Sequence, residues 1–216
     1  MKKILIVDDH PVLRDGLEGI ITRKDGLTVC GKAGSVKEAL AMVDETEPDM
    51  VLTDLSLPGR NGMELIKDLR TSHPELPVLV MSMHDELIYA ERILRAGGRG
   101  YLMKEASAEQ LLRAIARVLD GGVFVSETVT DHFLQGMSGK SGEKPSFPLQ
   151  RLTDRELEVF ELIGRGKGNH EIARMLSISP RTVDAHRTHI REKLKLADGN
   201  ELIRYSVRWI ESNMIQ

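Results

Sequence analysis

Five polar residues follow short apolar runs of this chain, and their types suit the transfer of a phosphoryl group. They are Asp8, Asp9, Asp54, Ser82 and Lys104. Carboxylates about 4 Å apart repel by roughly 4 kcal/mol at an effective dielectric near 20, so acids gathered in one place need a cation or raised pKa values. A hard divalent ion meets that need, and Mg²⁺ fits best. A carboxylate nucleophile, a metal, a hydroxyl and a cationic lysine together predict phosphoryl transfer onto Asp54.

Each of these residues also has a plain structural interpretation. A single aspartate at the end of a strand is more often a turn or capping residue than a functional one. What favours a functional site is the agreement of five residues at four strand ends.

The elements that must position these residues alternate between strand-like and helix-like segments. Five apolar runs could be strands: "KILIV", "LTVCGKA", "DMVLT", "LPVLVMS" and "GYLMK". Each is followed by a segment with helical periodicity, with start signals at Pro11, Ser35 and Ser107. The pattern predicts an α/β fold with a five-stranded, doubly wound parallel sheet in the order 2-1-3-4-5. Strands 1 and 3 are then neighbours, which brings the three acids to the ligand-binding edge of the sheet.

Composition places the chain among ordinary globular proteins. It has 216 residues, enough for one large or two modest domains, and a formal net charge of −3. The lone Cys30 excludes an internal disulfide, and we expect it to be a small core residue. The apolar run at 4–7 is too short for a signal peptide, and no window reaches the length of a membrane span. We therefore expect a cytoplasmic protein without a membrane partner.

The second half of the chain has a different texture. The segment "GMSGKSGEKPSFPLQ" lacks apolar periodicity and is typical of a linker. After it, four short amphipathic helices have start signals at Thr153, Asn169 and Ser179, with Pro180 at the first position of a helix. The predicted organisation is a domain at 1–122, a connector helix and flexible linker at 123–148, and a small all-α four-helix domain at 149–216.

The helical segment has the organisation of a helix-turn-helix. In "NHEIARMLSISPRTVDAHRTHIREKL" a first helix runs from about His170 to Leu176, and a second begins at Pro180. Residues 165–195 carry 8 Lys/Arg against 3 Asp/Glu, which is compatible with an anionic partner but also with a solvated helix face. The basic residues expected to point outward are Arg181, Arg187, Arg191, Lys193 and Lys195.

The segments "VDDH", "DLSLPGRNG", "VMSMHD" and "GYLMKEAS" resemble the flavodoxin-like receiver domain of two-component response regulators, over roughly residues 1–122. The resemblance implies that Asp54 accepts a phosphoryl group from a sensor histidine kinase. It also implies that Asp9, Asp54 and the backbone carbonyl of Ser56 hold Mg²⁺, and that Asp8 positions the ion.

The same resemblance assigns the remaining polar residues. Ser82 and Tyr101 would be the switch pair that rearranges on phosphorylation, and Lys104 would bind the phosphoryl oxygens. Tyr101 also has a plain alternative as a core aromatic. Pro58 and Gly59 would redirect the chain beside the site, and Gly62 would begin the next helix.

Residues 152–212 resemble the DNA-binding domain of the LuxR/FixJ/NarL type through "LTDRELEV", "NHEIA", "SPRTVDAHRTHIREKL" and "ELIRYSVRW". The resemblance implies that the helix at 180–194 enters the major groove of double-stranded promoter DNA. The residues expected at the DNA, within and just beyond the motif at 169–188, are Asn169, Ser179, Arg181, Thr182, Asp184, Ala185, Arg187, Thr188, His189, Arg191 and Lys193. Some members have lysines where Asp184 and Thr188 stand here, so base preference cannot be copied from a relative. An acid is repelled by phosphate but accepts a hydrogen bond from a cytosine amino group.

Together these features predict a DNA-binding response regulator whose DNA affinity depends on phosphate. We expect a homodimer on DNA through the last helix, with RNA polymerase as a further partner. The only enzymatic chemistry expected is Mg²⁺-dependent self-phosphorylation from a donor and slow self-dephosphorylation.

Other classes fit less well but stay open. An aspartate-nucleophile hydrolase would carry a second acid where Ser56 stands, and a nucleotide-binding oxidoreductase would have a Gly-rich turn in place of "DDH". A receiver that switches without phosphate is a further alternative, disfavoured by the intact acids and Lys104. His186 and His189 could face one metal, yet no further ligand lies at a supporting spacing.

Overall fold

The computed structural model describes residues 1–137 and 148–214 of the chain. The chain divides into two compact units, Met1–Ser138 and Gly139–Gln216. Most of the predicted flexible linker, residues 138–147, lies outside the described residues. None of the helices within the described ranges has both the length and the apolar character needed to cross a bilayer.

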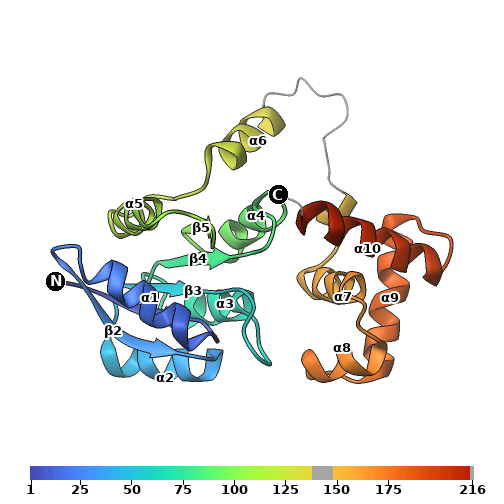
Figure 1. The fold of residues 1–216 in the computed structure, drawn as a ribbon, viewed down its shortest axis with the longest axis horizontal. Helices are drawn as coiled ribbons and strands as arrows, with labels where there is room; N and C mark the ends of the chain where they lie inside the picture. Colours follow the sequence, from blue (N-terminus) through green and yellow to red (C-terminus); the bar gives the residue numbers. More distant parts are fainter. Residues whose placement is uncertain (138–147, 215–216) are drawn as a thin grey trace. The chain divides into compact units, whose positions relative to one another are not determined.

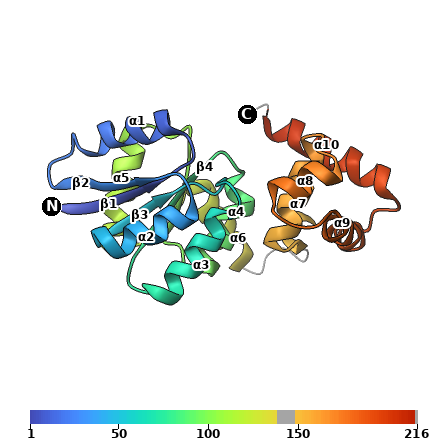
Figure 2. The same ribbon diagram turned by 90° about the horizontal axis from the view of Figure 1, so that it is seen from below.

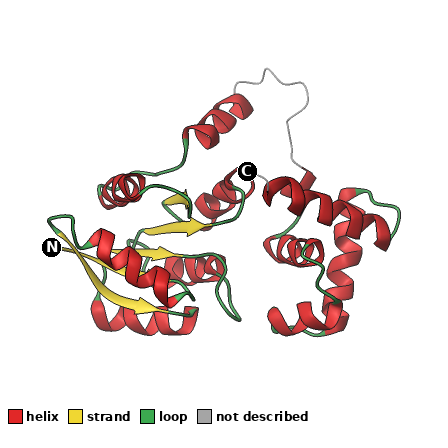
Figure 3. Ribbon diagram, in the orientation of Figure 1, coloured by secondary structure: helices red, strands yellow, loops and turns green. Residues whose placement is uncertain are grey.

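The first unit is an α/β fold built on five parallel strands (Figures 1 and 3). The strands are β1 (Lys2–Val7), β2 (Leu27–Ala33), β3 (Met50–Thr53), β4 (Val78–Ser82) and β5 (Gly100–Met103). The helices are α1 (Pro11–Ile21), α2 (Val36–Thr46), α3 (Gly62–Ser72), α4 (Glu86–Ala96), α5 (Ala108–Leu119) and α6 (Glu127–Met137). The strand order is β2-β1-β3-β4-β5, so the predicted fold class and topology are confirmed.

Helices cover both faces of this sheet. In Figure 2, α1 and α5 lie on one face and α2, α3 and α4 on the other. The core under α1 and α5 joins their apolar side chains to those of four strands, including Ile6, Leu52 and Leu79. Residues 4–7 are almost fully buried, as expected of a strand with helices on both sides.

The register of the central strands decides where the acids meet. Val7 on β1 pairs with Thr53 on β3, and the Asp54 N–H donates to the Val7 carbonyl at 2.8 Å. The residues that directly follow the two strands, Asp8 and Asp54, therefore emerge side by side at one edge of the sheet.

Local sequence signals set the helix starts of this unit. Ser35 and Ser107 cap α2 and α5 as predicted, and Pro11 is the first residue of α1. One expectation was wrong: Cys30 is only half-buried, because β2 is an edge strand of the sheet. Edge strands have a neighbour on one side only, so their side chains are covered less completely.

The predicted connector contains a helix, α6, which packs within the first unit. Before it, Phe124 forms a bridge to β5: its N–H donates to the Arg99 carbonyl at 3.0 Å, and its carbonyl accepts from Tyr101 N–H at 2.9 Å. The Ser126 hydroxyl donates to Glu86 of α4 at 2.8 Å. Val129 of α6 is almost fully buried. The start of the connector is thus tied to β5 and α4.

The second unit is a small helical domain. It consists of a 3₁₀ turn (Pro148–Arg151), α7 (Asp154–Gly164), α8 (Asn169–Met175), α9 (Pro180–Leu194) and α10 (Gly199–Met214). The four predicted helices are confirmed, and the 3₁₀ turn precedes them. The start signals at Thr153 and Ser179 are confirmed as caps, whereas the expected signal at Asn169 was wrong by one residue. Gly168 occupies the cap of α8, which leaves the Asn169 side chain available for other contacts.

A prediction follows from the close approach of α7 and α10. A Cβ on Gly164 would lie 2.5 Å from the Ser206 carbonyl oxygen, so Gly164→Ala must push the two helices apart. We expect it to destabilise this domain by about 1–3 kcal/mol.

Gly199→Ala, where a Cβ meets nothing within 4 Å, should cause no loss of stability and is the control. Trp209 of α10 is the only tryptophan of the chain, so its fluorescence in denaturant reports this domain alone. Equal unfolding midpoints for the two variants would contradict the prediction.

Candidate functional site

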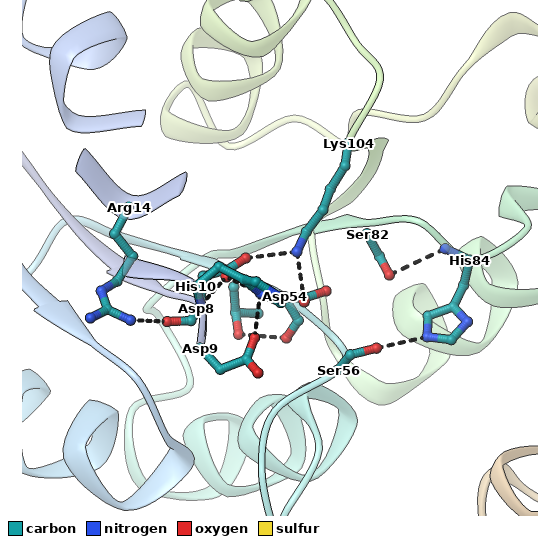
Figure 4. Close-up of polar contacts among 10 residues, drawn as sticks. Asp8, Asp9, His10, Arg14, Asp54, Ser56, Ser82, His84 and Lys104 are labelled. Carbon is teal, nitrogen blue, oxygen red and sulfur yellow. Dashed lines mark hydrogen bonds and ion pairs between the residues drawn. The ribbon is translucent and has the colours of Figure 1, made fainter. Parts of the chain in front are cut away.

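A partly buried lysine joins two buried carboxylates at the edge of the sheet (Figure 4). Lys104 Nζ lies 2.8 Å from Asp8 Oδ2 and 2.7 Å from Asp54 Oδ2. The side chains of both acids are less than 5% exposed, and that of Lys104 is 12% exposed. Three residues from the ends of β1, β3 and β5 therefore meet as the sequence predicted.

The charges of this cluster do not balance. Burial lowers the pKa of Lys104, but hydrogen bonds to Asp54 and Asp8 outweigh it and raise the pKa above the ordinary value of 10.5. The ammonium group is therefore charged at neutral pH, and one positive charge faces two carboxylates. With Asp9 beside them, the site can accept additional positive charge.

The oxygens of this cluster fit a hard cation. Asp54 Oδ1 is buried and has no hydrogen-bond partner in the described part of the chain, and a buried polar atom without a partner is costly. Ligand atoms of Asp8, Asp9 and His10 lie within 4.8 Å of one another. Carboxylate oxygens at such spacing suit Mg²⁺. Of the predicted ligands, Asp8 and Asp9 belong to this cluster, and Asp54 is linked to Asp8 through Lys104.

His10 is a neighbour that the sequence analysis did not single out. Its backbone N–H donates to Asp8 Oδ1 at 2.8 Å, and its Nδ1 lies 2.7 Å from Asp9 Oδ1. Arg14 donates to the Asp8 carbonyl oxygen. These contacts orient both acids, and the only sequence signal for them was the position of His10 directly after the acids.

The loop after Asp54 depends on a glycine. A Cβ on Gly62 would lie 2.1 Å from the Asp54 carbonyl oxygen, and the Gly62 N–H donates to the Leu55 carbonyl at 2.9 Å. The start of α3 therefore packs directly on the backbone of the acidic residue. The sequence predicted Gly62 as a helix start but not this close approach.

The predicted switch residues lie next to the cluster and are joined by His84. Ser82 is fully buried, and its carbonyl accepts from Lys104 N–H at 2.9 Å. The hydroxyl of the buried Tyr101 donates to the His84 carbonyl at 2.5 Å, and His84 Nε2 lies 3.0 Å from Ser56 Oγ (Figure 4 shows the latter pair). In this structure Tyr101 is a core aromatic bonded to the loop after Ser82, and its switching role stays a prediction. The sequence patterns did not predict these contacts of His84.

The residues expected at DNA divide into two groups. Six are exposed on α9: Arg181, Thr182, Asp184, Ala185, Thr188 and His189. Ser179 caps this helix and is also exposed. The half-buried residues are Asn169, Arg187, Arg191 and Lys193. The apolar positions Val183 and Ile190 of α9 are fully buried, so the helix has one buried face and one exposed face.

The expectation that Lys193 points outward was wrong. Its ammonium lies 2.6 Å from Oε2 of Glu156, a buried residue of α7. Burial raises the pKa of Glu156, but hydrogen bonds from Lys193 and Thr153 outweigh it and lower the pKa below 4.5. Lys193 thus neutralises a buried acid inside the domain, and its predicted DNA contact is not tested.

The two histidines of α9 differ in environment. His186 is half-buried, and burial is the main reason that its pKa is lowered. His189 is exposed. Over the described ranges, the cluster of potential metal ligands is the one at Asp8, Asp9 and His10, and it includes neither of these histidines.

Two families of known proteins match the two units. Residues 4–116 match the family described as response regulator receiver domain, and residues 150–206 match the family described as bacterial regulatory proteins, luxR family. The oxygen regulatory protein NreC of Staphylococcus carnosus (strain TM300) is 35% identical over 210 residues, which cover 95% of this chain and 97% of that protein. NreC of Staphylococcus aureus (strain bovine RF122 / ET3-1) is 38% identical with the same coverage.

Solved structures agree with the fold. A LuxR-family two-component response regulator from Aurantimonas sp. SI85-9A1 is 32% identical, with a TM-score of 0.59, and covers 63% of this chain and 97% of that chain. RcsB from Salmonella enterica serovar Typhimurium, bound to promoter rprA in the presence of the phosphomimetic BeF3-, is 22% identical. It covers 96% of this chain and 99% of its own, with a TM-score of 0.69, and at this identity shows the fold alone.

A pH-dependent stability prediction follows from Glu156. Glu156→Gln keeps the capping hydrogen bonds of α7 but removes the charge that pairs with Lys193. We expect the variant to lose about 1–3 kcal/mol of domain stability at neutral pH. An acid with a lowered folded pKa stabilises fully above its unfolded pKa and loses that contribution as pH falls through the folded pKa. The gap between wild type and variant should therefore shrink below pH 4.5.

The measurement is denaturant unfolding followed by Trp209 fluorescence between pH 7 and pH 3. Glu192→Gln, which neutralises an exposed acid of α9, is the matched control and should show little difference. A gap for Glu156→Gln that stayed constant over this pH range would refute the assignment.

Proposed function

This chain belongs to the response regulators of the LuxR family, and from that premise we propose that a phosphoryl group on Asp54 controls its binding to promoter DNA. One observation carries the proposal. The buried carboxylate of Asp54 has one oxygen bound to Lys104 and the other without a partner among the described residues. That is the arrangement a carboxylate acceptor needs, because one oxygen is oriented and one is left for the reacting phosphorus.

The proposed reaction is phosphoryl transfer from a phosphohistidine of a sensor kinase. A bond forms between an Asp54 carboxylate oxygen and phosphorus as the phosphorus–nitrogen bond of the donor breaks, and the donor imidazole keeps the electron pair and takes up a proton. Lys104 holds a positive charge 2.7 Å from Oδ2, the other oxygen of the Asp54 carboxylate, and can stabilise the charge that spreads over the phosphoryl oxygens. The protein is then a phosphate acceptor and not an enzyme that acts on other substrates.

Mg²⁺ is the proposed cofactor of this step. Asp8, Asp9, Asp54 and the backbone carbonyl of Ser56 would hold it, and when bound it would neutralise charge on the phosphoryl group. The support for it is the excess negative charge of the cluster and the unpartnered Asp54 oxygen.

The proposed output route uses contacts that leave the site. Ser82 and Lys104 would move toward the new phosphoryl group, and the Tyr101 hydroxyl, which is bonded to the His84 carbonyl, would follow that loop. The backbone of Tyr101 is bonded to Phe124, at the start of the connector. A change near the acceptor can thus reach the connector through neighbouring bonds. A shift from mostly off to mostly on requires about 5.5 kcal/mol of differential interaction.

The helical unit is the proposed reader of double-stranded DNA. Its α9 would enter the major groove, and a homodimer would place two such helices on two half-sites. RcsB, which has the same fold, was solved bound to promoter DNA in the presence of a phosphomimetic, and this supports the proposal by analogy. RNA polymerase is a proposed further partner of the DNA-bound form.

Labelled phosphate tests the acceptor directly. Wild-type protein incubated with a radiolabelled small-molecule phosphoramidate and Mg²⁺ should become labelled, whereas Asp54→Asn should not, because an amide is a far weaker nucleophile. Chelation of divalent cations should abolish the wild-type signal. Asp25→Asn alters an exposed turn residue and should label normally. Undiminished label on Asp54→Asn would refute the assignment of the acceptor.

DNA affinity tests the switch. Duplexes selected by the wild-type chain from a randomised library should bind more tightly by tenfold or more when beryllofluoride occupies the acceptor site, as a gain of 1.4 kcal/mol implies. The Asp54→Asn variant should not respond to beryllofluoride. Fluorescence polarisation over a salt series measures both affinities. Equal wild-type affinities with and without beryllofluoride would exclude phosphate control.

A further inference from the structure

An acidic side chain stands on the exposed face of the helix that is proposed to meet DNA. Asp184 is exposed on α9, near Arg181 and Thr188, which are also exposed. Phosphates repel a carboxylate, so Asp184 weakens any binding that depends on charge alone. An acid at this position is therefore useful for DNA binding only if it makes a specific contact that offsets this repulsion.

Asp184 is held by a neighbouring helix. The Asn169 side-chain amide, at the first position of α8, donates through Nδ2 to Asp184 Oδ1. The Asn169 amide oxygen accepts from Arg187 Nη1 at 3.2 Å. We call these three residues the Asn169 bridge.

The chemistry of the bridge permits one orientation of the amide. If the amide were turned over, its NH₂ group would face the guanidinium and its oxygen would face the carboxylate, and both contacts would be repulsive. The two ionic partners therefore fix Asn169, and Asn169 in turn fixes the direction of the Asp184 carboxylate. A side chain oriented in advance loses less conformational freedom when it binds a ligand.

The bridge uses only one oxygen of Asp184. The other, Oδ2, has no partner in the described part of the chain, and the residue is exposed. An oriented carboxylate oxygen accepts hydrogen bonds and cannot donate them. It therefore rejects base edges that present only acceptors.

Only some base edges in the major groove meet that requirement. Guanine presents two acceptors, and thymine presents one acceptor and a methyl group. Adenine has an amino group but places the N7 acceptor beside it, whereas cytosine presents its amino group without a neighbouring acceptor. Cytosine is therefore the base that fits an oriented carboxylate best.

We propose that Asp184, positioned by Asn169 and Arg187, is a specificity-determining residue that selects a cytosine at one position of the DNA site and weakens binding to all other sequences. This inference rests on the proposed function, because it requires that α9 reads DNA. The resemblance to relatives could not predict the base preference at this position, because some relatives have a lysine where Asp184 stands. The inference assigns that preference.

The experiment selects duplexes from a randomised library with the full-length chain in the presence of beryllofluoride, and compares four proteins. The wild type should enrich one position for cytosine. Asp184→Ala should lose the preference at that position, keep the preferences elsewhere, and bind a mixed-sequence duplex several-fold more tightly. Replacing the selected cytosine should weaken the wild type about tenfold and leave Asp184→Ala nearly unaffected.

Two further variants separate positioning and charge from base recognition. Asn169→Ala should weaken the same cytosine preference while the unfolding midpoint seen by Trp209 fluorescence stays within error, which a merely structural role would not produce. Glu192→Gln removes an exposed acid from the same helix and should keep every base preference.

Each outcome is decisive. If Asp184→Ala keeps the full cytosine preference of the wild type, or if the wild type selects a sequence without a cytosine that depends on Asp184, the inference is overturned while the proposed function stands. If the wild type enriches no sequence at all, the proposed reading of DNA fails, and the inference fails with it.

Discussion

The first unit depends on one electrostatic constraint, the shortage of positive charge around two buried carboxylates. Asp8 and Asp54 lie at the ends of adjacent strands, and the partly buried ammonium of Lys104 contacts both. The raised pKa of Lys104 shows that the pairing outweighs the cost of burial. The remaining negative charge favours a cation over a neutral or anionic ligand at this cluster.

Hydrogen bonds of His84 and Tyr101 connect the surroundings of this cluster to the start of the connector. His84 links the loop after β4 to Ser56 through its ring and to Tyr101 through its carbonyl. Tyr101 belongs to a strand whose backbone also bonds to Phe124. Because buried side chains and backbone ladders are close-packed, a displacement at one of these contacts is not absorbed locally. These hydrogen bonds are the contacts through which the proposed switch would reach the start of the connector.

The helical unit distributes its charges between stability and recognition. Lys193 and Glu156 form an ion pair inside the domain, whereas Asp184 and Arg187 flank an amide at its surface. A count of basic residues along 165–195 treats all of them alike, yet Lys193 is committed to a buried acid. Which charges are available to DNA is therefore a property of the packing of α7, α8 and α9.

The sequence alone determined the elements, their order and the five polar residues that gather at the sheet edge. These features depend on local signals: apolar runs for strands, capping side chains such as Ser107 and Thr153, and the rule that parallel strands end at a common edge. Only the tertiary structure decided the partners of the side chains. The contact of Lys104 with Asp8 joins residues 96 positions apart, and Cys30, His84, Lys193 and Asn169 took environments that no local pattern encodes. Even Gly62, correctly predicted as a helix start, has its main constraint in the Asp54 carbonyl across the loop. Hydrogen bonds and ion pairs act over about 3 Å in space, whereas sequence patterns record proximity along the chain.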